Sequence, residues 1–302
     1  MSWSEAHREA IIAAADAREE LQLDSFERID IFEALVQDGL KVMFRPLQGV
    51  AAFYEPPRQT ASAGVLINSK HPLALQRYSG AHEYGHHVFK HGRQVDRDGE
   101  LGAKRGTLTH EERLAEAFAA WFLMPPEAAR AALVRLGIER PAGPRDAYAL
   151  GLRLGVSYKA ICTHLPSLKL ASASVARGWA DLPLKEIKQE LTSTPPPAGW
   201  HNDVWVLTGA DAEAPLTARC GDRLLLNLPA RPVSLLPDGL AAHELPAQDL
   251  LSRPQLCIDL ASDAVPGPRR FELTYDGGGP VQFEVRLEQP LRGRYVSRKI
   301  TA

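Results

Sequence analysis

His82-Glu83-Tyr84-Gly85-His86 is the stretch around which the rest of the chain is organised. Two histidines four residues apart lie on one face of an α-helix, about one turn from each other, so their imidazole nitrogens can converge on one metal ion. A glutamate directly after the first histidine lies beside that ion, where it can accept a proton from water. The spacing therefore predicts a zinc site, with His82 and His86 as ligands and Glu83 as the general base.

The residues around this motif predict a packed helix. Tyr78, Ala81, Val88 and Phe89 recur at helical spacing and form an apolar stripe. A glycine inside a helix costs about 1 kcal/mol relative to alanine, so Gly85 indicates that another segment approaches the helix backbone there. The alternative is a surface helix that carries two histidines by chance, and the apolar stripe argues against it.

The composition predicts a soluble protein with two domains. The 302 residues are 45% hydrophobic, which is enough for sizeable cores. The net charge of −2 gives no general attraction to nucleic acid or to an anionic membrane. The sequence shows neither a signal peptide nor a run of about 18 apolar residues. Three single, distant cysteines fit a reducing compartment. We therefore expect a cytoplasmic protein with no membrane partner.

Two helices and a small sheet are predicted before the motif. Residues 4–21 and 25–39 have helical periodicity, with Ser25 placed to cap the second helix. We expect the β-branched and aromatic runs that follow to form an antiparallel sheet, which either covers the motif helix or binds an extended peptide at its edge. These runs are residues 41–44, 50–54 and 64–68.

A loop and a second helix are predicted after the motif. Residues 92–106 are charged and contain several glycines, and we interpret Asp96–Glu100 as a solvated turn rather than a calcium loop. A helix is predicted from Thr109 to Met124. It ends there because two prolines come directly after it.

This second helix carries the candidates for a third metal ligand. Zinc in a catalytic site takes three protein ligands and keeps one position open for water. Glu112 and Glu116 are four apart and share a face, whereas Glu111 diverges by one helical step. Glu112 also fits a capping box with Thr109, in which its carboxylate would bond to the backbone instead. Spacing alone leaves the choice between Glu112 and Glu116 open.

Together, the two motifs resemble those of the ImmA/IrrE-type zinc metallopeptidases. The second motif of that family has the pattern Glu-x-x-Ala-Asn-x-Phe-Ala-Ala-x-Leu-Leu-Met-Pro, which aligns without gaps with Glu112 to Pro125. The resemblance implies that His82, His86 and Glu112 bind Zn²⁺. The usual asparagine of the family is Glu116 here, which keeps Glu116 as an alternative ligand or as an outer partner of the site.

The same resemblance implies a zincin-like fold and an activity. It implies an endopeptidase of narrow specificity that cuts a helix-turn-helix transcriptional repressor and so releases stress, phage or mobile-element genes. The candidate donors to the reaction's oxyanion are Tyr78, Tyr84 and His110. The alternative is a catalytically silent, metallopeptidase-like regulator that acts by binding protein or DNA. Glu83 favours the enzyme, because a structural zinc site needs no general base.

A helix-turn-helix-like segment is predicted next. Residues 126–138 and 144–167 are helical in pattern, and Gly155-Val-Ser157 forms a turn in which Ser157 caps the second helix. Helix hairpins of this kind are common packing units, so DNA contact is the less favoured alternative. The side chains that would face DNA are Tyr158, Lys159, Thr163 and His164.

A proline-rich stretch divides the two predicted domains. Residues 192–199, Thr-Ser-Thr-Pro-Pro-Pro-Ala-Gly, favour an extended spacer. We therefore predict an α+β chain with a zinc metallopeptidase domain over 1–191, which includes the helix-turn-helix-like segment, and a regulatory or recognition domain over 200–302. About seven short strands in the latter are typical of an immunoglobulin-like β-sandwich.

The C-terminal region also resembles the chagasin-type inhibitor fold, on the stretch Gly221-Asp-Arg-Leu-Leu-Leu-Asn-Leu-Pro229 and the closing strands. The glycine-rich binding loop expected after Pro229 is replaced by Ala230-Arg-Pro-Val-Ser-Leu-Leu236. The resemblance therefore implies the fold and not the inhibition of cysteine proteases.

Overall fold

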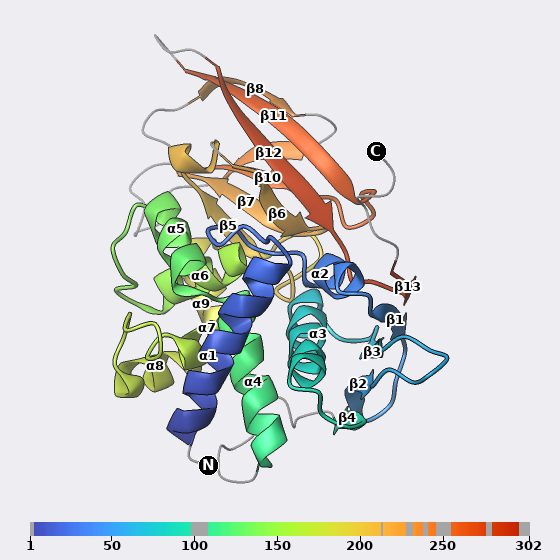
Figure 1. Ribbon diagram of the computed structural model, residues 1–302. Coiled ribbons are helices and arrows are strands. Elements are labelled where there is room, and N and C mark those ends of the chain that lie inside the picture. Colours follow the sequence, from blue (N-terminus) through green and yellow to red (C-terminus); the bar gives the residue numbers. More distant parts are fainter. Residues whose placement is uncertain are drawn as a thin grey trace. The chain divides into compact units, whose positions relative to one another are not determined.

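The computed structural model describes residues 3–97, 108–212, 214–227, 232–237, 241–245, 255–275 and 280–295. These residues form an α+β protein, in which helices and a five-stranded sheet are followed by small β-sheets (Figure 1). The predicted α+β class is therefore confirmed. No helix in the described ranges is long and apolar enough to cross a membrane.

The chain divides into two compact units. The first comprises Met1–Ala131, Leu154–Ala160 and Pro290–Ala302, and the second comprises Ala132–Arg153 and Ile161–Gln289. Both units are thus assembled from segments that are discontinuous in sequence. The predicted domain boundaries, including the spacer at 192–199, stay a prediction.

Three helices of the first unit carry or support the motifs. Helix α3 (Leu73–Val88) packs against α4 (His110–Leu123) and against strands of the sheet, and α1 (Trp3–Glu20) runs along α4 (Figure 1). Tyr84 of α3 meets Phe118 and Phe122 of α4 edge-on, with ring centroids 5.6 and 5.2 Å away. Aromatic contacts of this geometry stabilise a pair by about 0.5–1.5 kcal/mol beyond the burial itself, so they fix the two motif helices together.

Helix α2 (Ile31–Gln37) begins later than predicted. Asp30 is its cap, because the Asp30 side chain accepts hydrogen bonds from the backbone amides of Phe32 and Glu33. The prediction of Ser25 as the cap is wrong, since the helix starts where a carboxylate satisfies its first amides.

The sheet of the first unit is mixed, so the prediction of an antiparallel sheet is wrong. Strand β3 lies between β1 and β2, and it pairs with β1 in parallel and with β2 antiparallel. Two strands that were not predicted close the edges, both in antiparallel pairing. The strand order is β13 (Gly293–Arg294), β1 (Lys41–Arg45), β3 (Gly64–Asn68), β2 (Val50–Glu55) and β4 (Gln94–Arg97).

Strand β13 comes from the far end of the sequence. Its two residues pair with Met43 and Phe44 of β1. The backbone amide of Leu291 donates to the Gln76 side chain at 3.0 Å, across 215 positions of the chain. The Tyr295 hydroxyl donates to the Asp30 carboxylate at 3.1 Å. Residues 290–295 therefore belong to the same structure as the motif helices.

The second unit contains helices and two four-stranded sheets among the residues described. One sheet has the order β5 (Val204–Leu207), β7 (Arg223–Leu226), β10 (Gln255–Asp259) and β9 (Ala241–Leu245). The other has the order β6 (Leu216–Arg219), β12 (Val281–Glu288), β11 (Gly267–Tyr275) and β8 (Pro232–Pro237). Side chains of both sheets share one core, in which Phe271 and Phe283 stack at 5.1 Å.

Five helices lie between α4 and the first strand of these sheets, and the boundary between the units falls inside three of them, α5, α6 and α7. The five helices of this stretch are α5 (Pro126–Leu136), α6 (Pro144–Leu154), α7 (Tyr158–His164), α8 (Ala173–Ala180) and α9 (Leu184–Leu191). A short 3₁₀ turn follows β5 at Gly209–Ala212. Its Asp211 is buried and accepts two hydrogen bonds from Arg153 of α6, at 2.9 and 2.8 Å.

A buried polar network ties the second unit's helices α6 and α9 to its first strands. The Lys188 ammonium contacts the Asp203 carboxylate at 2.9 Å and donates to the Asn202 carbonyl at 2.7 Å. Asp222 is fully buried and accepts from the backbone amide of Asp203 at 2.8 Å. We call this group the Asp222 cluster; its members are Tyr148, Lys188, Asp203, Arg219 and Asp222.

Candidate metal centre

The first motif lies on α3, where the prediction placed it. His82, Glu83 and His86 are all buried. Gly85 makes this burial possible, because a Cβ atom added there would lie 2.9 Å from the Ala115 Cα atom of α4. The prediction that another segment approaches the backbone at Gly85 is confirmed. This close approach brings α4 and its glutamates next to the histidines.

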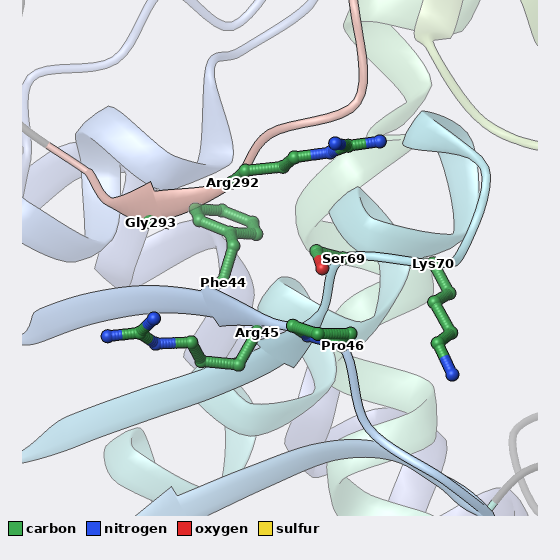
Figure 2. A pocket seen from close by; sticks show the side chains of 7 residues that line it. All are labelled: Phe44, Arg45, Pro46, Ser69, Lys70, Arg292 and Gly293. Atoms are coloured by element: carbon green, nitrogen blue, oxygen red, sulfur yellow. The ribbon is translucent and has the colours of Figure 1, made fainter.

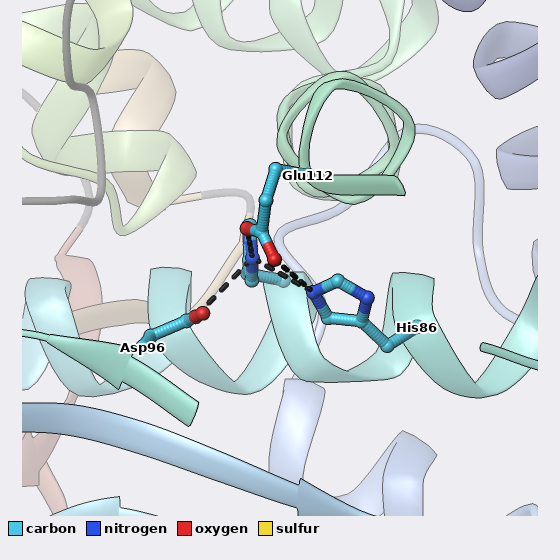
Figure 3. A group of neighbouring side chains, drawn as sticks. His86, Asp96 and Glu112 are labelled. Atoms are coloured by element: carbon cyan, nitrogen blue, oxygen red, sulfur yellow. Dashed lines mark hydrogen bonds and ion pairs between the residues drawn. The ribbon is translucent and has the colours of Figure 1, made fainter. Parts of the chain in front are cut away.

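Four side chains from three elements converge at this place. The Nε2 atom of His82 lies 3.1 Å from Nε2 of His86, 3.2 Å from Oε2 of Glu112 and 3.2 Å from Oδ2 of Asp96. Figure 3 shows His86 on α3, Glu112 on α4 and Asp96 on β4 facing one another. One ligand atom from each of the four residues lies within 4.8 Å of the others, so the group could hold a metal ion.

This set of donors fits zinc. Two imidazole nitrogens and carboxylate oxygens are ligands that Zn²⁺ accepts, at about 2.0–2.2 Å from the ion. An imidazole nitrogen carries at most one hydrogen, so that hydrogen cannot serve all three atoms that surround Nε2 of His82. A cation placed among them would satisfy every atom at once.

Asp96 is a candidate ligand that sequence reasoning missed. We interpreted Asp96–Glu100 as a solvated turn, and for Asp96 that is wrong: it is only 3% exposed and belongs to β4. Residues 98–100 lie outside the described residues. The alternation along β4 turns Asp96 inward while Val95 is 49% exposed. Alternation over four residues is too short a signal to recognise in the sequence.

Glu112 and Glu116 take different places around His82. Glu112 faces Nε2 of His82, as given above, and its Oε1 lies 3.6 Å from Nε2 of His86. Glu116 instead faces the other ring nitrogen, with Oε2 at 3.5 Å from Nδ1 of His82. Glu116 also accepts a hydrogen bond from the Tyr78 hydroxyl at 2.9 Å. The arrangement therefore places Glu112 among the converging atoms and Glu116 behind the His82 ring.

Each motif histidine thus has a contact on its outer nitrogen. His82 has Glu116, and His86 has His91, whose Nδ1 lies 2.8 Å from Nδ1 of His86. Metal-binding histidines commonly hold their second nitrogen in this way, because the contact fixes the tautomer and the ring orientation. His91 was part of the quoted stretch but had no predicted role.

The electrostatics of the two histidines are opposed. Burial alone would lower the pKa of His82, but the charges of Asp96, Glu112 and Glu116 outweigh it and raise that pKa well above its usual value. Burial, together with the charges of neighbouring His82 and His91, lowers the pKa of His86 to about 2. The carboxylates around His82 thus favour a positive charge there, whereas the imidazole of His86 stays neutral, as a metal ligand must be.

Glu83 is a buried carboxyl group beside the converging atoms. It is fully buried, and neither of its carboxylate oxygens has a hydrogen bond to another residue in the described ranges. Burial, together with the charge of Asp96, raises the pKa of Glu83 well above its usual value. A carboxyl group whose pKa is raised towards neutrality is suited to proton transfer.

The three candidate oxyanion donors differ in their surroundings. The Tyr78 hydroxyl donates to Glu116, and burial raises its pKa, so the phenol keeps its proton. Tyr84 is buried against Phe118 and Phe122. His110 is the first residue of α4 and is partly exposed. The oxyanion role stays a prediction for all three.

The predicted helix-turn-helix-like segment covers α6 and α7, and its role as one motif stays a prediction. Ser157 accepts a hydrogen bond from the amide of Ala160 at 3.2 Å, as expected of a cap. Two of the four side chains predicted to face DNA, Tyr158 and His164, are buried, while Lys159 and Thr163 are exposed. Only two of the four side chains predicted to contact DNA are therefore accessible.

A separate pocket of about 390 Å³ lies near the β1–β13 edge of the sheet. No residue of the metal centre lines it. Figure 2 shows that the charged ends of Arg45, Lys70 and Arg292 point in different directions rather than toward one point. This pocket therefore does not form the site of the chemistry.

Comparison with known proteins identifies the region that contains the centre. Residues 37–165 match the family model of the IrrE N-terminal-like domain, Peptidase_M78. The chain thus carries an IrrE-type, metallopeptidase-like domain that includes His82, His86, Asp96 and Glu112. The predicted resemblance is confirmed. None of the curated proteins matches the sequence.

Two solved structures are similar to parts of the chain. A cysteine protease inhibitor from Entamoeba histolytica covers 29% of this chain and 98% of its own, with 13% identity and a TM-score of 0.24. A transcriptional regulator from Mycobacterium tuberculosis covers 55% of this chain and 52% of its own, with 17% identity and a TM-score of 0.32. The first agrees with the chagasin-type resemblance, but neither TM-score is high enough to define a fold.

Proposed function

We propose that this chain is a zinc-dependent endopeptidase of narrow specificity. The observation that carries the proposal is the convergence of His82, His86 and Glu112 beside the buried carboxyl group of Glu83. A purely structural metal site has no use for a buried carboxyl group of raised pKa next to its ligands. A hydrolytic site can use such a group as its general base.

His82, His86 and Glu112 are the proposed ligands, and Glu83 is the proposed general base. When bound, Zn²⁺ supplies a Lewis acid that polarises a peptide carbonyl and lowers the pKa of water. Glu83 takes a proton from the attacking water and passes it to the amine that leaves. Its buried position keeps bulk water away from this transfer, and its raised pKa brings proton uptake closer to neutral pH.

Glu116 and His91 are proposed to orient the ligands. Their contacts with the outer nitrogens of His82 and His86 leave both Nε2 atoms directed at the same point. Holding the rings in one rotamer reduces the conformational freedom that would be lost on metal binding. We propose this positioning role for Glu116 rather than that of a ligand.

The proposed substrate is a helix-turn-helix transcriptional repressor, whose cleavage releases stress, phage or mobile-element genes. This step rests on the resemblance to ImmA/IrrE-type peptidases and on the matched domain over residues 37–165. We propose that the C-terminal β-region is an immunoglobulin-like sandwich that senses a signal or recruits the repressor.

The test is proteolysis of candidate repressors encoded near the gene. The full chain loaded with Zn²⁺ is incubated with each repressor, with and without a chelator, and fragments are identified by mass. We expect one defined cut that the chelator abolishes. Glu112→Ala serves as the metal-free control, because it removes a ligand. A zinc-loaded protein that binds a repressor or DNA without cutting would favour the silent regulator instead.

A further inference from the structure

Asp96 contacts Nε2 of His82, the atom that His86 and Glu112 also contact. Its carboxylate lies 3.2 Å from Nε2 of His82, which is also the distance from that nitrogen to the Glu112 carboxylate. The Asp96 side chain is 4% exposed, whereas the Glu112 side chain is 23% exposed. Asp96 is therefore the more buried of the two carboxylates, and it reaches the centre from the side of the sheet.

The number of protein ligands separates two kinds of zinc site. Structural sites have four protein ligands, whereas catalytic sites have three and leave the fourth position to water or substrate. His82, His86, Glu112 and Asp96 together supply four ligand atoms that lie within 4.8 Å of one another. We propose that Asp96 is a fourth metal ligand that takes the position of the catalytic water, so that the described conformation is a self-blocked resting state of the proposed peptidase.

The strand that carries Asp96 also takes the place of a substrate. β4 pairs antiparallel with β2 at the end of the sheet, next to the strands that pack against α3. An extended peptide binds to a sheet edge by this same pairing of main-chain groups. With β4 in place, the edge of β2 beside the centre is already paired. Asp96 and β4 thus exclude water and peptide together.

Two side-chain contacts at the start of β4 are exposed in the described part of the chain. Arg93, just before the strand, forms an ion pair with Glu55 at 2.7 Å, and its own side chain is 60% exposed. Gln94 donates to Glu111 at 2.9 Å, and this hydrogen bond is also exposed. Exposed contacts of this kind contribute little to stability. A peptide that pairs with β2 can therefore compete with a strand of four residues, and it would displace Asp96 in doing so.

Removal of the Asp96 carboxylate should have opposite effects on metal affinity and on the rate of cleavage. Removing the Asp96 carboxylate removes a ligand, so the protein holds its metal less tightly. The same change opens the fourth position, so a saturated variant cuts faster. If Asp96 served only to stabilise β4, its removal would not weaken metal binding and raise the cleavage rate at the same time.

The experiment compares Asp96→Ala and Asp96→Asn with wild type in the full chain. Metal affinity is measured by competition with a chromophoric chelator, and the ligand set is monitored by the visible absorption of bound Co²⁺. Val95→Ala is the matched control, because Val95 is on the same strand and is 49% exposed. Circular dichroism verifies that each variant is folded. Asp96→Asn keeps the size of the side chain, so it remains informative where Asp96→Ala unfolds.

We expect affinity to fall at least about tenfold in both variants, which is the low end of the loss seen when even an outer partner of a ligand is removed. We also expect a changed Co²⁺ spectrum, and no change in Val95→Ala. At saturating metal, repressor cleavage should be faster than in wild type. The blocking role rests on the proposed function, whereas the two metal readouts do not.

The outcomes separate the two proposals. Unchanged affinity and an unchanged Co²⁺ spectrum would overturn the fourth ligand. A fall in affinity, with slower cleavage at saturating metal, would overturn the blocking role. A fall in affinity, with no cleavage by wild type or any variant, would support the fourth ligand and count against the peptidase function instead.

Discussion

Two buried polar clusters of this molecule are built on different principles. In the Asp222 cluster, Asp203 contacts both Lys188 and Arg219, at 2.9 and 2.7 Å. Asp222 accepts hydrogen bonds from the Asp203 amide, the Trp205 ring, the Arg219 amide and the Asn202 side chain. In the metal centre, imidazoles and carboxylates crowd one point instead, and Glu83 beside them is buried without a hydrogen bond from the described residues.

The difference shows that burial does not distinguish a structural cluster from a functional one. Asp222 and Glu83 are both fully buried. Buried ions are tolerated when each is matched by partners, as in the Asp222 cluster. A cluster that is not matched by its own residues calls for a partner that the described part of the chain does not supply, and the donor set of the metal centre indicates a cation. The same carboxylate-to-amide substitution should therefore have opposite consequences at residues 83 and 222.

The largest effect is expected for Glu83→Gln. Loss of a general base lowers a rate by about 10²–10⁴-fold, so repressor cleavage should fall by that factor. Zinc content should be unchanged, because Glu83 is not a proposed ligand. The thermal midpoint should also change little, because glutamine keeps the size of the side chain and Glu83 has no hydrogen bond to the described residues that could be lost. Cleavage at the wild-type rate would show that Glu83 is not the base.

Asp222→Asn should destabilise the second unit and leave the metal centre intact. Either orientation of the amide turns its NH₂ group toward hydrogen-bond donors: the Trp205 ring and the Arg219 amide on one side, and the Asp203 amide on the other. We expect a loss of about 3 kcal/mol in the free energy of unfolding, measured by urea titration of the zinc-loaded chain.

The matched control for this variant is Glu284→Gln in the same unit. Glu284 pairs with Arg270 at 3.1 Å on the surface, so its substitution should change stability by less than about 0.5 kcal/mol. Equal effects of the two substitutions would mean that the Asp222 cluster is not a structural element. A loss of zinc in Asp222→Asn would mean that the two clusters depend on one another.

Glu116→Gln should have the smallest effect of the three. Glu116 contacts the outer nitrogen of His82, and loss of such a partner lowers metal affinity about 10–100-fold. Chelator competition measures this change. Glu111→Gln is the control on the same helix, since an amide oxygen can still accept the hydrogen bond from Gln94. If both variants lose the same affinity, the orienting role of Glu116 is wrong.

Local rules in the sequence predicted the helical part of the centre. The i, i+4 spacing of His82 and His86 and the glycine between the helices concern neighbours within one element, and periodicity is sufficient there. Glu112 shows where two local rules compete. Its backbone amide donates to Thr109 at 3.2 Å, as in a capping box, while its carboxylate faces His82. Only one half of the capping box forms, because the side chain has another partner.

The local rules could not predict contacts between segments that are distant in the sequence. Asp96 reaches the centre only because β4 pairs with β2 in a register that turns this residue inward. The order of the sheet depends on β3 entering between β1 and β2, and on a strand at residue 293. Neither arrangement leaves a periodic signal, since strand pairing is set by tertiary packing rather than by local preference.

Strand β13 makes the sheet of the first unit depend on residues that are synthesised long after the motif helices. The segment that donates to Gln76 is made 215 residues later, which is roughly 10–40 s at a translation rate of about 5–20 residues per second. During that interval the emerging chain holds both motif helices while one edge of their sheet has no partner. A nascent chain in this state exposes the β1 edge to other proteins. Cellular folding of this chain should therefore depend on chaperones that shield the β1 edge until residues 293 and 294 have been made.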